Sequence, residues 1–278
     1  MAHASRKQTL DELLAAYPGN LAFLGENIST GRTVGWHEDR TSATASCIKL
    51  FVLAAMFAEA ENGSLSLDER VSVSASDRIG GSGVLKHLSA GVEMNWHDLA
   101  TLMIVLSDNV ATNMVIDRIG IQTINSSIRA LGFGSTHLIN RIDFDAIGSD
   151  IEKLAVSTPA DGVRCMRRLA EGRLVSQHAS ARMIEILSRQ HYVDLLLRKL
   201  PYDPYARDLG HKPTLTVAGK TGFFPGFRGD VVLIEQGENR VVMAAFATGK
   251  DKSFSPDNTI AHALGEIGLA AFDHLTAS

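Results

Sequence analysis

Strand-like segments lie at both ends of this chain, and a long helical part separates them. Apolar and β-branched runs predict strands at 19–25, 33–37, 214–220, 230–236 and 240–248. The middle of the chain predicts helices at 46–61, 96–106, 109–119, 122–131, 159–171, 177–190 and 191–199. Two further helices are predicted near the ends, at 7–17 and 256–275.

Strands from the two ends can form one sheet only if the termini come together in space. We therefore predict an α/β plus all-α fold, in which an antiparallel β-sheet is flanked by N- and C-terminal helices. The sheet domain would be built from residues 1–43 and 201–278, with an inserted all-helical domain at 44–200. The cleft between the two parts is the expected place for an active site.

Composition excludes several classes of partner. The formal net charge is −4, from 27 basic and 31 acidic residues, and no long basic run indicates a nucleic acid partner. The longest apolar run, 50–58, is about half as long as a membrane span requires. Two cysteines are too few for a disulfide framework. No signal peptide is recognisable, so we expect a cytoplasmic protein or a processed exported form. We also expect a monomer or a weak homodimer.

The predicted helix that opens at Ser46 carries a lysine in unusual surroundings. After its first turn this helix is apolar all round, which indicates a buried helix. Lys49 lies one turn after Ser46, so both side chains share a face. A buried lysine with a lowered pKa can deprotonate a neighbouring serine. The alternative is an ordinary surface lysine beside a helix N-cap, and one Ser-x-x-Lys pattern arises easily by chance.

Two triplets strengthen the catalytic interpretation. Ser107-Asp108-Asn109 falls at a break between two helical patterns, where it could point into a cleft or simply cap the next helix. Lys220-Thr221-Gly222 follows the predicted strand 214–220, where Gly222 would let a substrate approach the strand edge. The alternative interpretation is that this triplet only forms a hairpin turn. The order of the three motifs along one chain makes coincidence untenable.

These motifs resemble those of the penicilloyl serine transferase superfamily, and specifically of class A β-lactamases. The resemblance implies a β-lactamase/transpeptidase-like fold with Ser46 as the acylated nucleophile and Lys49 as its proton acceptor. Ser107, helped by Lys220, would pass a proton to the leaving nitrogen.

The resemblance also implies how a substrate is held. Asn109 would bind its side-chain amide, while Asp108 would hold the loop. The backbone N–H groups of Ser46 and Phe223 would form the oxyanion hole. A small-molecule substrate would place a carboxylate in a subsite formed by Lys220, Thr221 and Arg228, where Arg228 could instead be a surface arginine.

The sequence departs from that family in the segment expected to activate the deacylating water. The family pattern is Arg-x-Glu-x-x-x-Asn, whereas residues 140–147 read NRIDFDAI. The matching carboxylate is the shorter Asp143, and Ile147 stands at the amide position. Asp143 could act through a water, Asp145 could replace it, or the loop could be structural only. Phe223 and Phe224 add bulk at the mouth of the site, which suggests a different acyl group.

The sequence shows no other established kind of site. No metal-ligand spacing is present among the histidines and cysteines, and Gly80-Gly81-Ser82-Gly83 lacks the residues of a phosphate-binding loop, so we expect neither metal nor cofactor. Three functions remain open. The first is a β-lactamase-type serine hydrolase of a β-lactam or related amide, the second a penicillin-binding acyl-enzyme former with slow deacylation, and the third an amidase or esterase on another substrate.

Overall fold

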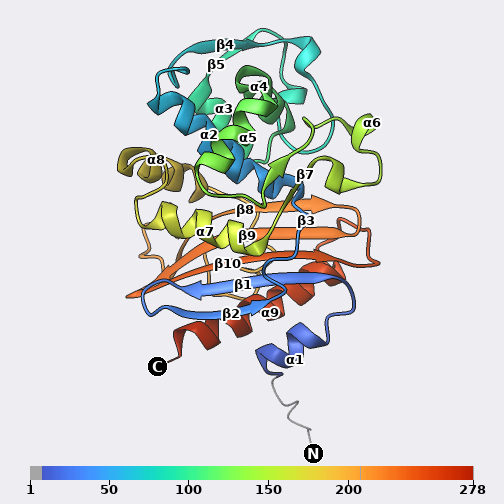
Figure 1. Ribbon diagram of the computed structural model, residues 1–278, viewed down its shortest axis with the longest axis vertical. Helices are drawn as coiled ribbons and strands as arrows, with labels where there is room; N and C mark the ends of the chain where they lie inside the picture. Colours follow the sequence, from blue (N-terminus) through green and yellow to red (C-terminus); the bar gives the residue numbers. More distant parts are fainter. Residues whose placement is uncertain (1–7, 207, 278) are drawn as a thin grey trace, which may run out of the picture.

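The computed structural model describes residues 8–206 and 208–277. Its main sheet has five antiparallel strands in the order β2-β1-β10-β9-β8. The strands are β1 (Leu21–Asn27), β2 (Arg32–Trp36), β8 (Thr216–Phe224), β9 (Phe227–Gln236) and β10 (Asn239–Thr248). Because β1 pairs with β10, the sheet joins the two ends of the chain, as predicted (Figure 1).

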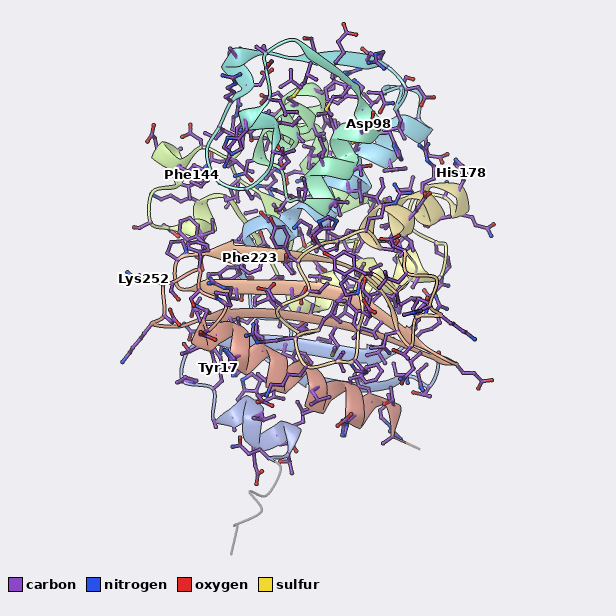
Figure 2. All side chains as sticks on the ribbon, turned by 180° about the vertical axis from the view of Figure 1, so that it is seen from behind. Tyr17, Asp98, Phe144, His178, Phe223 and Lys252 are labelled. Atoms are coloured by element: carbon purple, nitrogen blue, oxygen red, sulfur yellow. The ribbon has the colours of Figure 1, made fainter. Side chains whose placement is uncertain are left out.

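Helices cover both faces of this sheet. Alternate residues of β9 point to opposite sides, so Val231 packs in the core that contains α7 (Pro159–Ala170) and Val232 in the core that contains α9 (Thr259–Thr276). Figure 1 shows α7 in front of the sheet, and Figure 2, from behind, shows α9 in front of it. The short α1 (Leu10–Ala15) packs beside α9.

The second part of the molecule lies beyond strand β8 (Figure 1). Its centre is α2 (Ile48–Glu61), which is buried over most of its length. Around α2 lie α3 (Trp96–Val105), α4 (Asn109–Ile119), α5 (Ile121–Ala130) and α8 (Gln177–Leu187). This part also contains α6 (Phe144–Ile147) and the 3-10 turns η1 (Ala45–Cys47), η2 (Ala75–Asp77), η3 (Leu85–His87) and η4 (Ile151–Lys153).

The segment 44–200 is not purely helical. It contains the strands β4 (Arg70–Val73), β5 (Val92–Asn95), β6 (His137–Leu138) and β7 (Ala155–Ser157), the last paired with β3 (Ser42–Ala43). In addition, α7 packs on the main sheet rather than among the other helices. The division into 1–43 with 201–278 and 44–200 stays a prediction.

Three predicted elements differ from the structure. Residues 191–199 form turns, not a helix, because Leu195, Leu196 and Leu197 are all buried and the Leu196 N–H donates to the Asp230 carboxylate at 3.1 Å. Strand β8 continues past the predicted end, so the Lys-Thr-Gly triplet lies within it. The helix predicted at 7–17 is confirmed only for α1, and residue 7 lies outside the described residues.

No helix in the described ranges has the length and apolar character to cross a membrane.

Candidate active site

Ser46 sits in the 3-10 turn η1, immediately before α2. It is half-buried, and its hydroxyl caps neither η1 nor α2. The preceding residue, Ala45, has a φ of 43°, a left-handed conformation that costs free energy for a residue other than glycine. Ser46 therefore follows a strained residue in its turn. The alternative interpretation of Ser46 as a simple helix N-cap is wrong, because its hydroxyl makes no capping hydrogen bond.

The Lys49 side chain is fully buried on α2. Its Nζ lies 2.7 Å from the Ser107 carbonyl oxygen, 3.1 Å from Ser107 Oγ and 2.9 Å from Asn109 Oδ1. Burial lowers the pKa of Lys49 well below its usual value, and the nearby positive charge of Lys220 lowers this pKa further, while Asp108 opposes both. A neutral amine fits this site, because it can donate to the two carbonyl oxygens and accept from the Ser107 hydroxyl.

The Ser-Asp-Asn triplet spans the junction between α3 and α4. Ser107 has a φ of 52°, another left-handed residue in the site. Buried Asp108 accepts from Ala111 N at the start of α4, and its other oxygen accepts from Val84 N at 2.6 Å and Leu85 N at 2.9 Å. Asp108 thus both caps α4 and ties Val84 and Leu85 to this junction, which combines the N-cap alternative with the loop-holding role that the resemblance implies.

Lys220, Thr221 and Gly222 lie on β8, the edge strand nearest α2. Lys220 is fully buried, and burial lowers its pKa to about 8, against the opposing influence of Cys47 and Asp230. The Lys220 ammonium donates to the Thr221 carbonyl oxygen at 2.8 Å. The Thr221 hydroxyl is buried and has no hydrogen-bond partner in the described part of the chain.

Gly222 lies directly against the turn that carries Ser46. A Cβ atom at position 222 would lie 2.4 Å from the Thr44 carbonyl oxygen and 3.1 Å from the Ser46 backbone nitrogen. The close approach that the sequence analysis assigned to a substrate is thus made by the chain itself. It brings the Ser46 N–H beside β8, where an oxyanion hole requires it.

Arg228 does not line the cavity at Ser46. Its guanidinium donates to the carbonyl oxygens of Phe224, Phe227 and Ser253, and lies about 5 Å from the ring centres of Phe223 and Phe254. Because these hydrogen bonds already occupy the guanidinium, they compete with a bound carboxylate. The expected role of Arg228 stays a prediction, which this geometry weakens.

Asp143 is likewise outside the cavity lining. It is the N-cap of α6, and its Oδ1 accepts from Asp145 N at 3.0 Å and Ala146 N at 3.1 Å. Its neighbours Ile142 and Ile147 line the cavity instead. The buried Asn113 side chain fixes this arrangement, because it both donates to the Ile142 carbonyl oxygen and accepts from the Ile142 N–H, each at 2.8 Å.

A cavity of about 640 Å³ opens over Ser46. Four residues of the predicted set line it, namely Ser46, Ser107, Asn109 and Phe223. Its lining also includes four residues that the sequence analysis did not name as site residues, namely Phe144, Tyr192, Asp194 and Phe254. Asp194 Oδ1 is buried and has no hydrogen-bond partner in the described part of the chain. Tyr192, Asp194 and Phe254 lie on irregular segments and Phe144 lies on α6, and no sequence motif marked them as site residues because only tertiary packing brings them to the cavity. Among the described residues, no cluster of histidine, cysteine or carboxylate side chains is arranged to hold a metal ion.

Comparison with known proteins identifies the family. The model of the Beta-lactamase2 family, described as the beta-lactamase enzyme family, matches residues 5–275, so the chain belongs to this family. A crystal structure of a beta-lactamase from Sphaerobacter thermophilus superposes with a TM-score of 0.83 and 27% identity, covering 96% of this chain and 97% of that one. The family and the fold class predicted from the three motifs are both confirmed.

One further solved structure has the same fold, and one curated protein is similar in sequence over part of its length. An acyl-enzyme complex of a PBP-A mutant with penicillin G superposes with a TM-score of 0.80 and 23% identity, over 95% of this chain and 94% of that one. Beta-lactamase AER-1 of Aeromonas hydrophila is 26% identical over 177 residues, which are 63% of this chain. That alignment spans 58% of the length of AER-1.

Proposed function

We propose that this protein is a serine hydrolase of the β-lactamase type that is acylated at Ser46 and opens a cyclic or related amide bond. The observation that carries the proposal is the buried Lys49 amine, held within 3.1 Å of Ser107 Oγ one helical turn from Ser46. Burial lowers the pKa of this amine well below its usual value, which favours the neutral form that can accept a proton.

The described residues can accept and return every proton that the acylation of Ser46 requires. Lys49 Nζ takes the proton of Ser46 Oγ as that oxygen bonds to the amide carbon. The oxyanion that forms is stabilised by the N–H groups of Ser46 and Phe223. The carbon–nitrogen bond then breaks, and a proton returns from Lys49 through the Ser107 hydroxyl to the leaving nitrogen. Lys220, whose positive charge lies near Lys49, favours the neutral form of that amine.

We further propose that deacylation is slow. A hydrolytic water would need a carboxylate and an amide beside it to activate it. At that place Ile142 and Ile147 face the cavity, and Asp143 is the N-cap of α6. An apolar wall offers a water no hydrogen bond, and a misplacement of a catalytic group by about 1 Å can already cost on the order of a hundredfold in rate. The protein would then behave as an acyl-enzyme former, the second of the functions that the sequence left open.

For the substrate we propose a small molecule with a carboxylate near the scissile amide. Thr221 and Lys220 are buried just outside the cavity lining, as Arg228 is. We assign the carboxylate to Thr221 and Lys220 because the Thr221 hydroxyl has no partner in the described chain, while Arg228 donates to three backbone carbonyl oxygens. No nucleic acid, membrane or cofactor is part of this proposal, and we expect a monomer or weak homodimer.

Intact-mass measurement after incubation with penicillin G tests the proposal. We expect a stable mass increase of one penicillin in the wild type and none in Ser46→Ala. Because the Ser46 hydroxyl makes no capping hydrogen bond, this variant is expected to keep its melting temperature. A lasting adduct in Ser46→Ala would contradict the assignment of the nucleophile. No adduct in the wild type would favour the amidase or esterase.

A further inference from the structure

One end of the cavity at Ser46 is apolar beyond what the proposed chemistry needs. From the loop after β6 come Ile142, Phe144, Ile147, Ile151 and Leu154, here called the loop wall. From the sheet side come Phe223, Phe224, Pro225 and Phe254, here called the sheet wall. Figure 2 shows Phe144 on the loop beside the helical part and Phe223 at the facing edge of the sheet.

The loop wall is held in place by packing and by hydrogen bonds. Ile142, Ile147 and Leu154 are buried in the core that surrounds α2, so they present a fixed surface to the cavity. Phe144 reaches across the opening toward Gly81, where an added Cβ atom would lie 3.1 Å from the Phe144 ring. The Asn113 pair of hydrogen bonds to Ile142 prevents the loop from sliding.

The polar residues at the same cavity are largely engaged with the protein. Asn109 Oδ1 accepts from Lys49, and its Nδ2 donates to the Gly80 carbonyl oxygen at 3.0 Å. The Ser82 hydroxyl donates to the Ser107 carbonyl oxygen at 2.8 Å. Asp194, whose Oδ1 has no partner in the described chain, is the exception. A substrate therefore finds few free hydrogen-bonding groups, and most of the lining offers apolar contact.

We propose that the acyl group transferred to Ser46 is hydrophobic, an alkyl or aryl chain that lies between the loop wall and the sheet wall. This inference rests on the proposed acylation of Ser46 and adds the class of acyl group. Burying each methylene of such a chain favours the bound state and the acylation transition state alike. The expected gain is up to about fourfold in kcat/KM per methylene.

A series of p-nitrophenyl esters, from acetate through butyrate and hexanoate to octanoate, measures this directly. Ser46 Oγ attacks the ester carbonyl, its proton passes to Lys49, and p-nitrophenolate leaves as a coloured product. We expect a burst of p-nitrophenolate with every ester and a kcat/KM that rises about two- to fourfold per methylene toward the longer chains. A kcat/KM that stays flat or falls along the series would overturn the inference.

Two variants test whether the chain-length preference comes from the cavity lining or from any exposed apolar residue nearby. Phe144→Ala removes a ring of the loop wall that is 40% exposed, and we expect it to reduce the gain per methylene, so that kcat/KM for octanoate falls more than kcat/KM for acetate. Ile139→Ala is the matched control, because Ile139 is 41% exposed in the same region but does not line the cavity. An equal loss of chain-length preference in both variants would count against the loop wall.

The failure of this inference is distinguishable from the failure of the proposed function. A Ser46-dependent burst that shows no chain-length preference overturns the hydrophobic acyl group alone. Turnover of the esters by Ser46→Ala at the wild-type rate, or release of p-nitrophenolate by the wild type no faster than by Ser46→Ala, overturns the acylation at Ser46 and this inference with it.

Discussion

At the scale of single residues, Lys49 combines features that rarely occur together in a soluble protein. A lysine with no exposed surface must be neutral or paired, and no carboxylate lies within ion-pair distance of its Nζ in the described chain. Its environment supplies carbonyl and hydroxyl oxygens instead. Burial is therefore the dominant cause of its lowered pKa, and the proximity of Lys220 acts in the same direction.

The pH dependence of acylation follows from this lowered pKa. A base acts only when unprotonated, so the acylation rate should rise with pH through the lowered pKa of Lys49 and be constant well before pH reaches the usual lysine value of about 10.4. Stopped-flow kinetics with a chromogenic β-lactam or ester would measure it. Lys49→Met should reduce the rate at neutral pH by about 10²–10⁴-fold. A wild-type rate that keeps rising to pH 10 would contradict the role of Lys49 as base.

Gly222 gives a second prediction at this scale. Gly222→Ala places a Cβ atom 2.4 Å from the Thr44 carbonyl oxygen, so the Ser46 turn and β8 must move apart. A displacement of about 1 Å at the oxyanion hole should slow acylation on the order of a hundredfold. Gly134→Ala is the control, because a Cβ atom at Gly134 meets nothing within 4 Å. Equal acylation rates in the two variants would show that the close approach does not position Ser46.

At the scale of elements, the short helix α6 decides what the 140–147 loop presents to the cavity. Asp143 begins α6 as its N-cap, and this turns Ile142 and Ile147, on either side of it, toward Ser46. The sequence motif suggested a catalytic carboxylate at this position. The backbone N–H groups of Asp145 and Ala146 offer that carboxylate a local alternative, as they do at many helix N-termini.

Replacing Asp143 separates the two interpretations. We expect Asp143→Ala to lower the free energy of unfolding by about 0.5–2 kcal/mol, the usual loss for an N-cap. The slow steady phase after the acylation burst should keep its rate. Denaturant unfolding and burst kinetics on the same preparations would measure both. A slower steady phase with an unchanged burst would instead show that Asp143 supports deacylation.

At the scale of the whole molecule, buried charges make stability depend on pH. Asp230 on β9 is buried, and burial raises its pKa to about 7, while burial lowers the pKa of Lys220 on β8 to about 8. The folded state therefore holds a proton on Asp230 that the unfolded chain releases above about pH 4. Conversely, the unfolded chain holds a proton on Lys220, up to about pH 10, that the folded state releases.

These two groups should produce a minimum in stability near pH 7–8. As pH rises from about 4 to about 7, the Asp230 contribution falls by a few kcal/mol, and as pH rises from about 8 to 10 the Lys220 contribution increases by a similar amount. Urea unfolding across this range, compared with Asp230→Asn and Lys220→Met, tests both limbs. We expect Asp230→Asn to flatten the acidic limb and Lys220→Met to lessen the basic limb, which buried Lys49 also supports because its pKa is lowered as well. Parallel curves for all three proteins would refute the assignment.

The sequence by itself determined the three motifs, the family and the joining of both termini in one sheet. Ser-x-x-Lys, Ser-Asp-Asn and Lys-Thr-Gly are local patterns, and alternating or helical apolar spacing is also local, so both can be identified without coordinates. The buried state of Lys49 followed from the apolar helix around it. The predicted helix at 191–199 failed because its leucines pack on the sheet, a contact that no local pattern reveals.

Only the tertiary structure decided what surrounds the three motifs. Asp143 could act on a water or cap a helix, and the fold turned it away from Ser46 because α6 begins there. Arg228 could bind a substrate or the backbone. In the fold its guanidinium donates to the Ser253 carbonyl oxygen and lies against the rings of Phe223 and Phe254. The apolar cavity is formed by residues from distant segments, so its character depends on long-range packing, which the order of residues along the chain does not display.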